Sequence, residues 1–173
     1  MIIQTTRDDH RVAWLTALAI TIHVVESALP SPLPGVKPGL ANVVTIVVLI
    51  KFGWQMAAWV NLLRAVAGSL LIGTFLSPTF ILSLSGAIAS IIILALLSQL
   101  PGRGCGPLGY SVASAIGHTL AQFWIAYEVF IQHDGLFVLL PLLMTAAFAF
   151  GVIGGIIAFV VLEQLKIETV QNS

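Results

Sequence analysis

The sequence has very little charge and almost no cysteine. Only 8% of its 173 residues are charged, whereas a soluble domain carries about 25%, so this chain cannot cover itself with a water-facing surface. The formal net charge is zero, and no basic run indicates nucleic-acid binding. Cys105 is the only cysteine, which excludes an internal disulfide and a CxxC metal site, and we therefore expect no metal and no cofactor.

Catalytic motifs are also missing. The sequence contains no Walker A loop, no GxSxG, no HExxH and no DDxxD pair of the kind that holds magnesium and diphosphate. Its only adjacent acidic pair, Asp8-Asp9, lies in a short N-terminal tail without a second cluster. These absences argue against an autonomous enzyme.

Apolar residues dominate instead. They make up 58% of the chain, and the mean hydropathy is +1.05, which predicts an integral membrane protein of the all-α, polytopic class. Six apolar segments are expected to form its transmembrane helices, and they are Arg11–Leu29, Gly39–Phe52, Trp54–Leu76, Thr79–Leu100, Leu108–Ile131 and Leu136–Leu165.

The second segment is too short to cross a bilayer alone. It spans about 21 Å of the roughly 30 Å of hydrocarbon, and a proline-rich stretch, Pro30–Pro38, precedes it. Irregular backbone at membrane depth is tolerated only where protein or a wet cavity satisfies its polar groups. Either the second segment is re-entrant, or Pro30–Pro38 dips into the protein and supplies the missing depth, which makes Pro30–Pro38 a candidate lid rather than a plain connector.

The lysines and arginines predict the orientation. With six spans and a cytoplasmic N-terminus, nearly all lie inside and only Lys37 lies outside; those inside are Arg7, Arg11, Lys51, Arg103 and Lys166. The expected organisation is a cytoplasmic tail at 1–10, a six-helix domain at 11–165 and a cytoplasmic tail at 166–173. Within the domain, loop 30–38 is external and loop 101–107 is cytoplasmic. The expected location is the cell (inner) membrane, as a multi-pass protein.

Several polar residues fall inside these spans, where they are costly and are functional candidates by default. Most are expected in the middle and outer parts of the bundle, below the external loop. The candidate substrate-binding residues are His23, Glu26, Lys37, Asn42, Arg64, His118 and Gln122. The competing interpretation is structural: an ion pair between Glu26 and Arg64, with hydrogen bonds between helices from His118 and Gln122.

Two pairs of small residues are spaced four apart, which lets helices approach closely. Ala13 and Ala17 lie in the cytoplasmic half of the first segment, and Gly151 and Gly155 lie in the last. On spacing alone, both pairs favour packing within the bundle.

Three stretches of the chain resemble a known membrane family. They read LPGVKPGLANVVT (Leu33–Thr45) after VVESALP, LLRAVAGSLLIGTFLSPTFILSLSGAIAS (Leu62–Ser90) and LGYSVASAIGHTLAQFWIA (Leu108–Ala126). They resemble the heptaprenyl diphosphate synthase component I family, also called the Gx transporter family, over roughly residues 12–161. Pro38 departs from the pattern and should shorten the second helix further.

The resemblance carries expectations about fold and partners. The family is similar in architecture to the substrate-binding S-components of energy-coupling-factor transporters, which have six helices, both termini inside and an external first loop that closes over the substrate. In S-components an alanine pair on the first helix docks on the coupling subunit, and Ala13 and Ala17 occupy the matching place.

Three functions remain open at this point. The first is a substrate-binding and translocating subunit for a vitamin-like or isoprenoid/quinone-related molecule, working with a coupling subunit and its ATPases. The second is a non-catalytic component of a polyprenyl diphosphate synthase, because the chain lacks the acidic clusters of a synthase and would need a separate catalytic subunit. The third is a structural membrane subunit of a larger complex.

Overall fold

The computed structural model describes residues 7–28, 40–99 and 105–171, and within them every regular element is a helix. This confirms the all-α class. The α-helices are α1 (Arg7–Ala28), α2 (Leu40–Phe52), α3 (Trp54–Ile72), α4 (Pro78–Ser98), α5 (Pro107–Ile125) and α6 (Leu140–Gln171). A π-helical turn, η1 (Ala126–Ile131), and a 3₁₀ turn, η2 (Asp134–Leu139), connect α5 to α6.

Local signals set the turn between α3 and α4. Helix α3 ends at Gly73, whose φ of 76° is the left-handed conformation that glycine adopts at little cost. Ser77 then caps α4, because its hydroxyl accepts a hydrogen bond from the Phe80 backbone N–H at 3.3 Å. Pro78 occupies the first turn of α4, where its missing N–H costs nothing. These local signals place the start of α4 at Ser77-Pro78.

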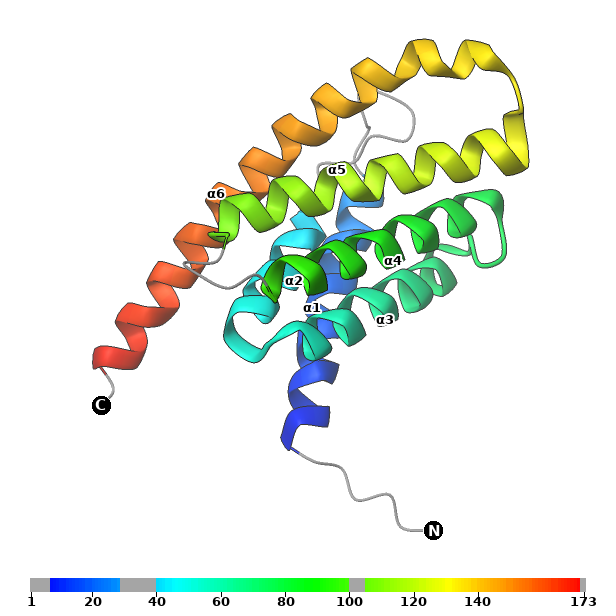
Figure 1. The fold of residues 1–173 in the computed structure, drawn as a ribbon. Helices are drawn as coiled ribbons and strands as arrows, with labels where there is room; N and C mark the ends of the chain where they lie inside the picture. Colours follow the sequence, from blue (N-terminus) through cyan, green and yellow to red (C-terminus); the bar gives the residue numbers. More distant parts are fainter. Residues whose placement is uncertain (1–6, 29–39, 100–104, 172–173) are drawn as a thin grey trace.

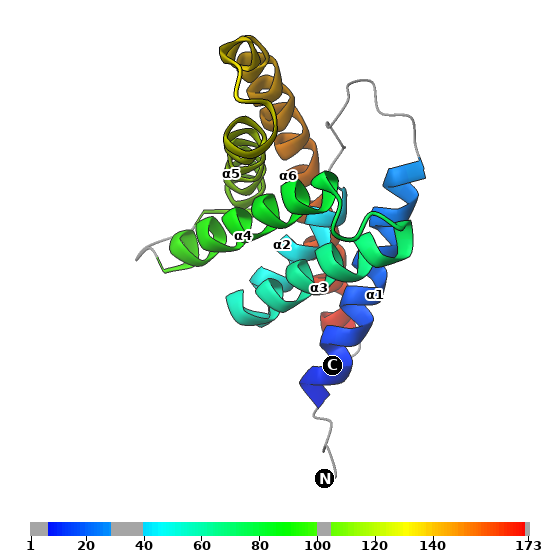
Figure 2. The ribbon, with the colours of Figure 1, turned by 90° about the vertical axis from the view of Figure 1, so that its right-hand side faces the viewer.

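The short helix α2 occupies the centre of the molecule (Figure 1). It packs against α1, α3, α5 and α6, while α5 packs most extensively against α4 and α6. Helix α1 crosses α3 at a steep angle, as Figure 2 shows. Because neighbouring helices surround α2, its length does not have to match the thickness of a bilayer.

The apolar core is built around α2. Val44, Val48 and Leu49 pack in one cluster with residues of α1, α3 and α4, while Val43 and Ile46 pack in a second cluster with Ala158 of α6. Most residues of α2 are β-branched, and β-branched side chains weaken the intrinsic helix propensity. The helix forms because, in apolar surroundings, its backbone N–H and C=O groups can form hydrogen bonds only with one another.

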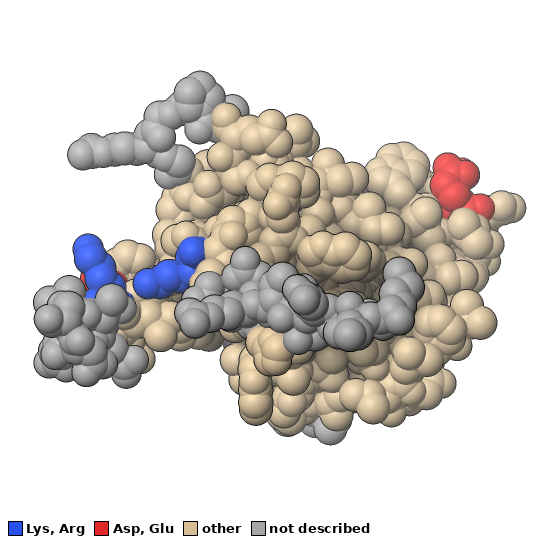
Figure 3. All heavy atoms as spheres, turned by 90° about the horizontal axis from the view of Figure 1, so that it is seen from below, with Lys and Arg blue, Asp and Glu red and all other residues tan. Residues whose placement is uncertain are grey.

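The outer surface is that of a membrane protein. Among the described residues, three helical spans are long and apolar enough to cross a bilayer: Trp54–Ile72, Pro78–Ser98 and Asp134–Ile167. Large apolar side chains such as Trp14, Leu71 and Val138 are more than 70% exposed, which is far from what a water-facing surface shows. In the view of Figure 3, charged side chains lie toward opposite ends with uncharged surface between them.

The glycine pair of α6 packs inside the molecule, as the spacing predicted. A Cβ atom on Gly151 would lie 2.9 Å from Cα of Val112, and one on Gly155 would lie 2.7 Å from Cα of Leu108. Both neighbours are backbone atoms of α5, which cannot rotate away. Glycine is therefore required for the close approach of α6 to α5.

Candidate functional site

Arg64 lies near the middle of α3 and is oriented by a neighbour one turn away. Its Nη2 donates a hydrogen bond to Oδ1 of Asn61. Asn61 is fully buried, and its Nδ2 donates in turn to the carbonyl oxygen of Ala87 on α4 at 3.3 Å. The guanidinium is thus held by a side chain that itself bridges α3 and α4.

Two residues of α1 reach the same region. Glu26 is buried, with 4% of its surface exposed, and its charge acts on Arg64. His23 lies one turn before Glu26, and its ring covers Gly68 of α3, where a Cβ atom would lie 2.9 Å from the ring. The absence of a side chain at Gly68 therefore makes room for His23.

His118 projects from α5 onto α4. A Cβ atom on Gly86 would lie 2.6–2.7 Å from three atoms of the His118 ring, so glycine is needed there too. Nδ1 of His118 is 3.3 Å from the Ser90 hydroxyl, and the ring also bonds the backbone of Gly86. His118 interacts electrostatically with both Arg64 and His23.

Asn42 joins the central helix to the same group. Its Nδ2 donates to the Ser114 hydroxyl at 2.9 Å, and the Ser114 carbonyl accepts from the Ser90 hydroxyl at 3.2 Å. Gln122 is half-buried one turn beyond His118 and makes no side-chain hydrogen bond with any described residue. Asn42 is therefore linked to His118 through Ser114 and Ser90, whereas Gln122 is only near them along the helix.

These residues form one polar network across five helices, comprising His23, Glu26, Asn42, Asn61, Arg64, Ser90, Ser114 and His118. The structure thus brings together five of the predicted substrate-binding residues. Lys37 and the proposed lid at Pro30–Pro38 lie outside the described residues. Ala13 and Ala17 are both exposed on α1, so they do not pack within the bundle as spacing alone had suggested.

The sequence interpretation missed three uncharged members of the polar network, Asn61, Ser90 and Ser114. Asn61 stands three residues before Arg64, so both lie on one face of α3. Ser111, Ser114 and His118 likewise recur at helical spacing along α5. Helical periodicity among polar residues within an apolar span was the signal that would have found Asn61 and Ser114.

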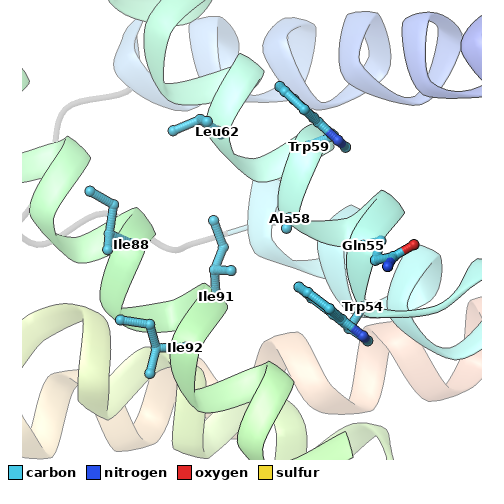
Figure 4. A pocket seen from close by; sticks show the side chains of 8 residues that line it. All are labelled: Trp54, Gln55, Ala58, Trp59, Leu62, Ile88, Ile91 and Ile92. Carbon is cyan, nitrogen blue, oxygen red and sulfur yellow. The ribbon is translucent and has the colours of Figure 1, made fainter.

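The surface carries two hollows away from the polar network. One is an apolar groove of about 480 Å³ between the first half of α3 and the second half of α4 (Figure 4). It is lined by Trp54, Gln55, Ala58, Trp59, Leu62, Ile88, Ile91 and Ile92. The second, of about 540 Å³, lies beside it, shares Trp54 and extends to Cys105 and Gly106 at the start of α5.

Comparison with protein families matches residues 15–161 to heptaprenyl diphosphate synthase component I. The chain belongs to this family. The match confirms the resemblance noted in the sequence, and it contains every residue of the polar network. Neither the curated proteins nor the solved structures include a match to this member of the heptaprenyl diphosphate synthase component I family.

Proposed function

We propose that this protein is a membrane subunit that binds and translocates a small molecule, either vitamin-like or related to isoprenoids and quinones. One observation carries the proposal: costly polar side chains of five helices converge on one network. Arg64, His23 and His118 in this network are only half-buried, so a water-sized molecule can touch part of each residue. A purely structural hydrogen-bond network gains nothing from staying accessible, whereas a binding site requires it.

The proposal includes a six-span topology in the cell membrane with both termini in the cytoplasm. The start of α1 and the end of α6 lie toward the same end of the molecule in Figure 1, and the turn between α5 and α6 lies at the other. Exposed Lys51 and Lys166 belong to the first end, and exposed Glu128 and Asp134 to the second. This distribution fits the positive-inside rule. The proposed topology sets the domain limits at 11–165, with loop 30–38 outside and loop 101–107 in the cytoplasm.

An exposed small-residue face supports a docking role. Ala13 and Ala17 face outward on α1, beside exposed Trp14 and Leu18. In the S-component resemblance this face would contact a coupling subunit that works with ATPases. The exposure leaves the face free for such a partner, and the docking role of Ala13 and Ala17 stays a prediction.

A thermal-stability screen tests the binding function. The purified protein would be heated in detergent with vitamins, flavins and isoprenoid precursors, and the folded fraction read by size-exclusion chromatography. One class is expected to stabilise the protein, because a ligand present at 100 times its Kd contributes about 2.7 kcal/mol to the folded state.

His118→Ala is the variant for this screen, and Trp124→Ala, on the exposed side of α5, is its control. The first is expected to lose the ligand shift and the second to keep it. If no compound stabilises the protein, the binding function is contradicted and the polar network serves only to hold the helices together.

We propose a second candidate, in which the protein is a non-catalytic membrane component serving a separate prenyl diphosphate synthase. The family name describes one component of such a synthase. The apolar groove between α3 and α4 favours this function, because its lining is almost entirely isoleucine, leucine, alanine and tryptophan (Figure 4). A prenyl chain leaving a synthase would find there an apolar surface continuous with the bilayer.

Filling the groove tests this second function. Ala58→Trp places an indole on the floor of the groove, and it is expected to shorten the isoprenoid side chain of the quinones by at least one unit in a strain that carries it. Leu70→Trp adds a similar ring to the exposed side of α3 outside the groove and should leave the chain length unchanged. Normal quinones in the Ala58→Trp strain, with the protein present at the wild-type level, would contradict the role.

A further inference from the structure

Arg64 carries a buried donor, Nε, that no described residue pairs. Its Nη2 is engaged by Asn61, whereas Nε is buried and has no hydrogen-bond acceptor among the described residues. Buried donors in native proteins are almost always paired, and a charged donor left unpaired is the most costly kind. A hydrogen-bond acceptor from outside the described residues is therefore needed to pair Nε of Arg64.

The orientation of Arg64 is fixed before any ligand arrives. Asn61 is fully buried, accepts from Nη2 and donates to the Ala87 carbonyl. Because α3 and α4 both hold Asn61, the plane of the guanidinium cannot rotate freely to find a partner. A preorganised donor of this kind favours one position for the group that it binds.

The remaining part of Arg64 is accessible. The residue as a whole is only half-buried, while its Nε is enclosed. Asn61 occupies only one N–H of the guanidinium among the described residues, so further N–H donors beside Nε remain for a ligand. Arginine binds a planar carboxylate or a phosphate through two parallel N–H donors.

We infer that the substrate of the polar network carries an anionic oxygen group, a carboxylate or a phosphate, which accepts a hydrogen bond from Nε of Arg64. The inference rests on the proposed binding function and adds its substrate class. Glu26 balances the charge of Arg64 while the site is empty, and the His118 ring lies within electrostatic range of Arg64. Arg64 is the anchor because, unlike the two histidines, His23 and His118, its guanidinium stays positively charged at every physiological pH.

Matched pairs of probes test the inference on the wild-type protein, so no variant has to fold. Each pair is one molecule with and without its anionic group: riboflavin 5′-phosphate and riboflavin, biotin and biotinamide, geranylgeranyl diphosphate and geranylgeraniol. In the pair that stabilises the full-length protein in detergent, the neutral member is expected to need at least a tenfold higher concentration for the same thermal shift.

Two variants then assign the effect to Arg64. Arg64→Met should abolish the shift caused by the anionic member. Arg64→Lys keeps the positive charge but lacks the planar pair of N–H donors. The anionic member should therefore need at least a tenfold higher concentration to give the same thermal shift in this variant.

The outcomes separate this inference from the proposed function. Equal shifts from both members of a pair, unchanged in Arg64→Lys, would overturn the anionic substrate class and leave the binding function standing. No shift from any pair would overturn the binding function, and the inference would fall with it.

Discussion

Replacing Gly151 and Gly155 together by alanine is expected to lower the free energy of unfolding by about 3 kcal/mol, the sum of two overpacked sites. Each new Cβ atom would overlap a backbone Cα atom of α5, at Val112 or Leu108. Alanine raises helix propensity by up to about 1 kcal/mol per site, but that gain is smaller than the cost of pushing two backbones apart. Unfolding by sodium dodecyl sulfate titration in mixed micelles measures the change.

Gly154→Ala is the matched control on the same helix. Its Cβ atom would lie 3.2 Å from the Ser111 hydroxyl, a side-chain atom that can turn away. The gain in helix propensity should then balance the contact, and the stability should stay within about 0.5 kcal/mol of wild type. If the double variant were as stable as Gly154→Ala, the close approach of α5 and α6 would be wrong.

The second large effect concerns topology. Cys105 is exposed and is the only cysteine of the chain, and the proposed topology places it in the cytoplasmic loop 101–107. In intact cells a membrane-impermeant maleimide is expected to leave Cys105 unlabelled, because the bilayer separates the reagent from the thiol. Permeabilising the cells should bring labelling to completion.

A second cysteine position serves as the control for labelling. In Cys105→Ser/His133→Cys, the thiol lies on the exposed turn before η2, which the topology places outside. This variant should label fully in intact cells. Labelling of Cys105 in intact cells, with His133→Cys left unlabelled, would show that the proposed orientation is reversed, and equal labelling of both would contradict the placement of the two positions on opposite sides of the membrane.

Helix positions were predictable from the sequence, and some helix ends were not. The predicted segment Thr79–Leu100 became α4 at Pro78–Ser98, because Ser77 and Pro78 are strong local start signals. The expected helix Leu108–Ile131 instead ends as α5 at Ile125 and continues as a π-helical turn. No local residue pattern announces that change, because it depends on how η1 and η2 pack; Phe137 of η2 stacks on Phe123 and Tyr127.

Part of the candidate site was also predictable from the sequence. Charged residues such as Glu26 and Arg64 stand out in an apolar span because burying them is costly. Asn61, Ser90 and Ser114 are cheaper to bury, so composition alone did not select them. Only the packing of α2 against α5 shows that Asn42 reaches Ser114.

The sequence by itself determined that this protein is helical and belongs in a membrane, since low charge and long apolar runs leave no other way to satisfy the backbone. It also determined the family, through the stretches around Leu33–Thr45, Leu62–Ser90 and Leu108–Ala126. The tertiary structure decided that the short helix α2 is central rather than peripheral, and that residues far apart in the chain form one polar network. Such contacts depend on which helix faces meet, and periodicity within a single helix does not specify its neighbours.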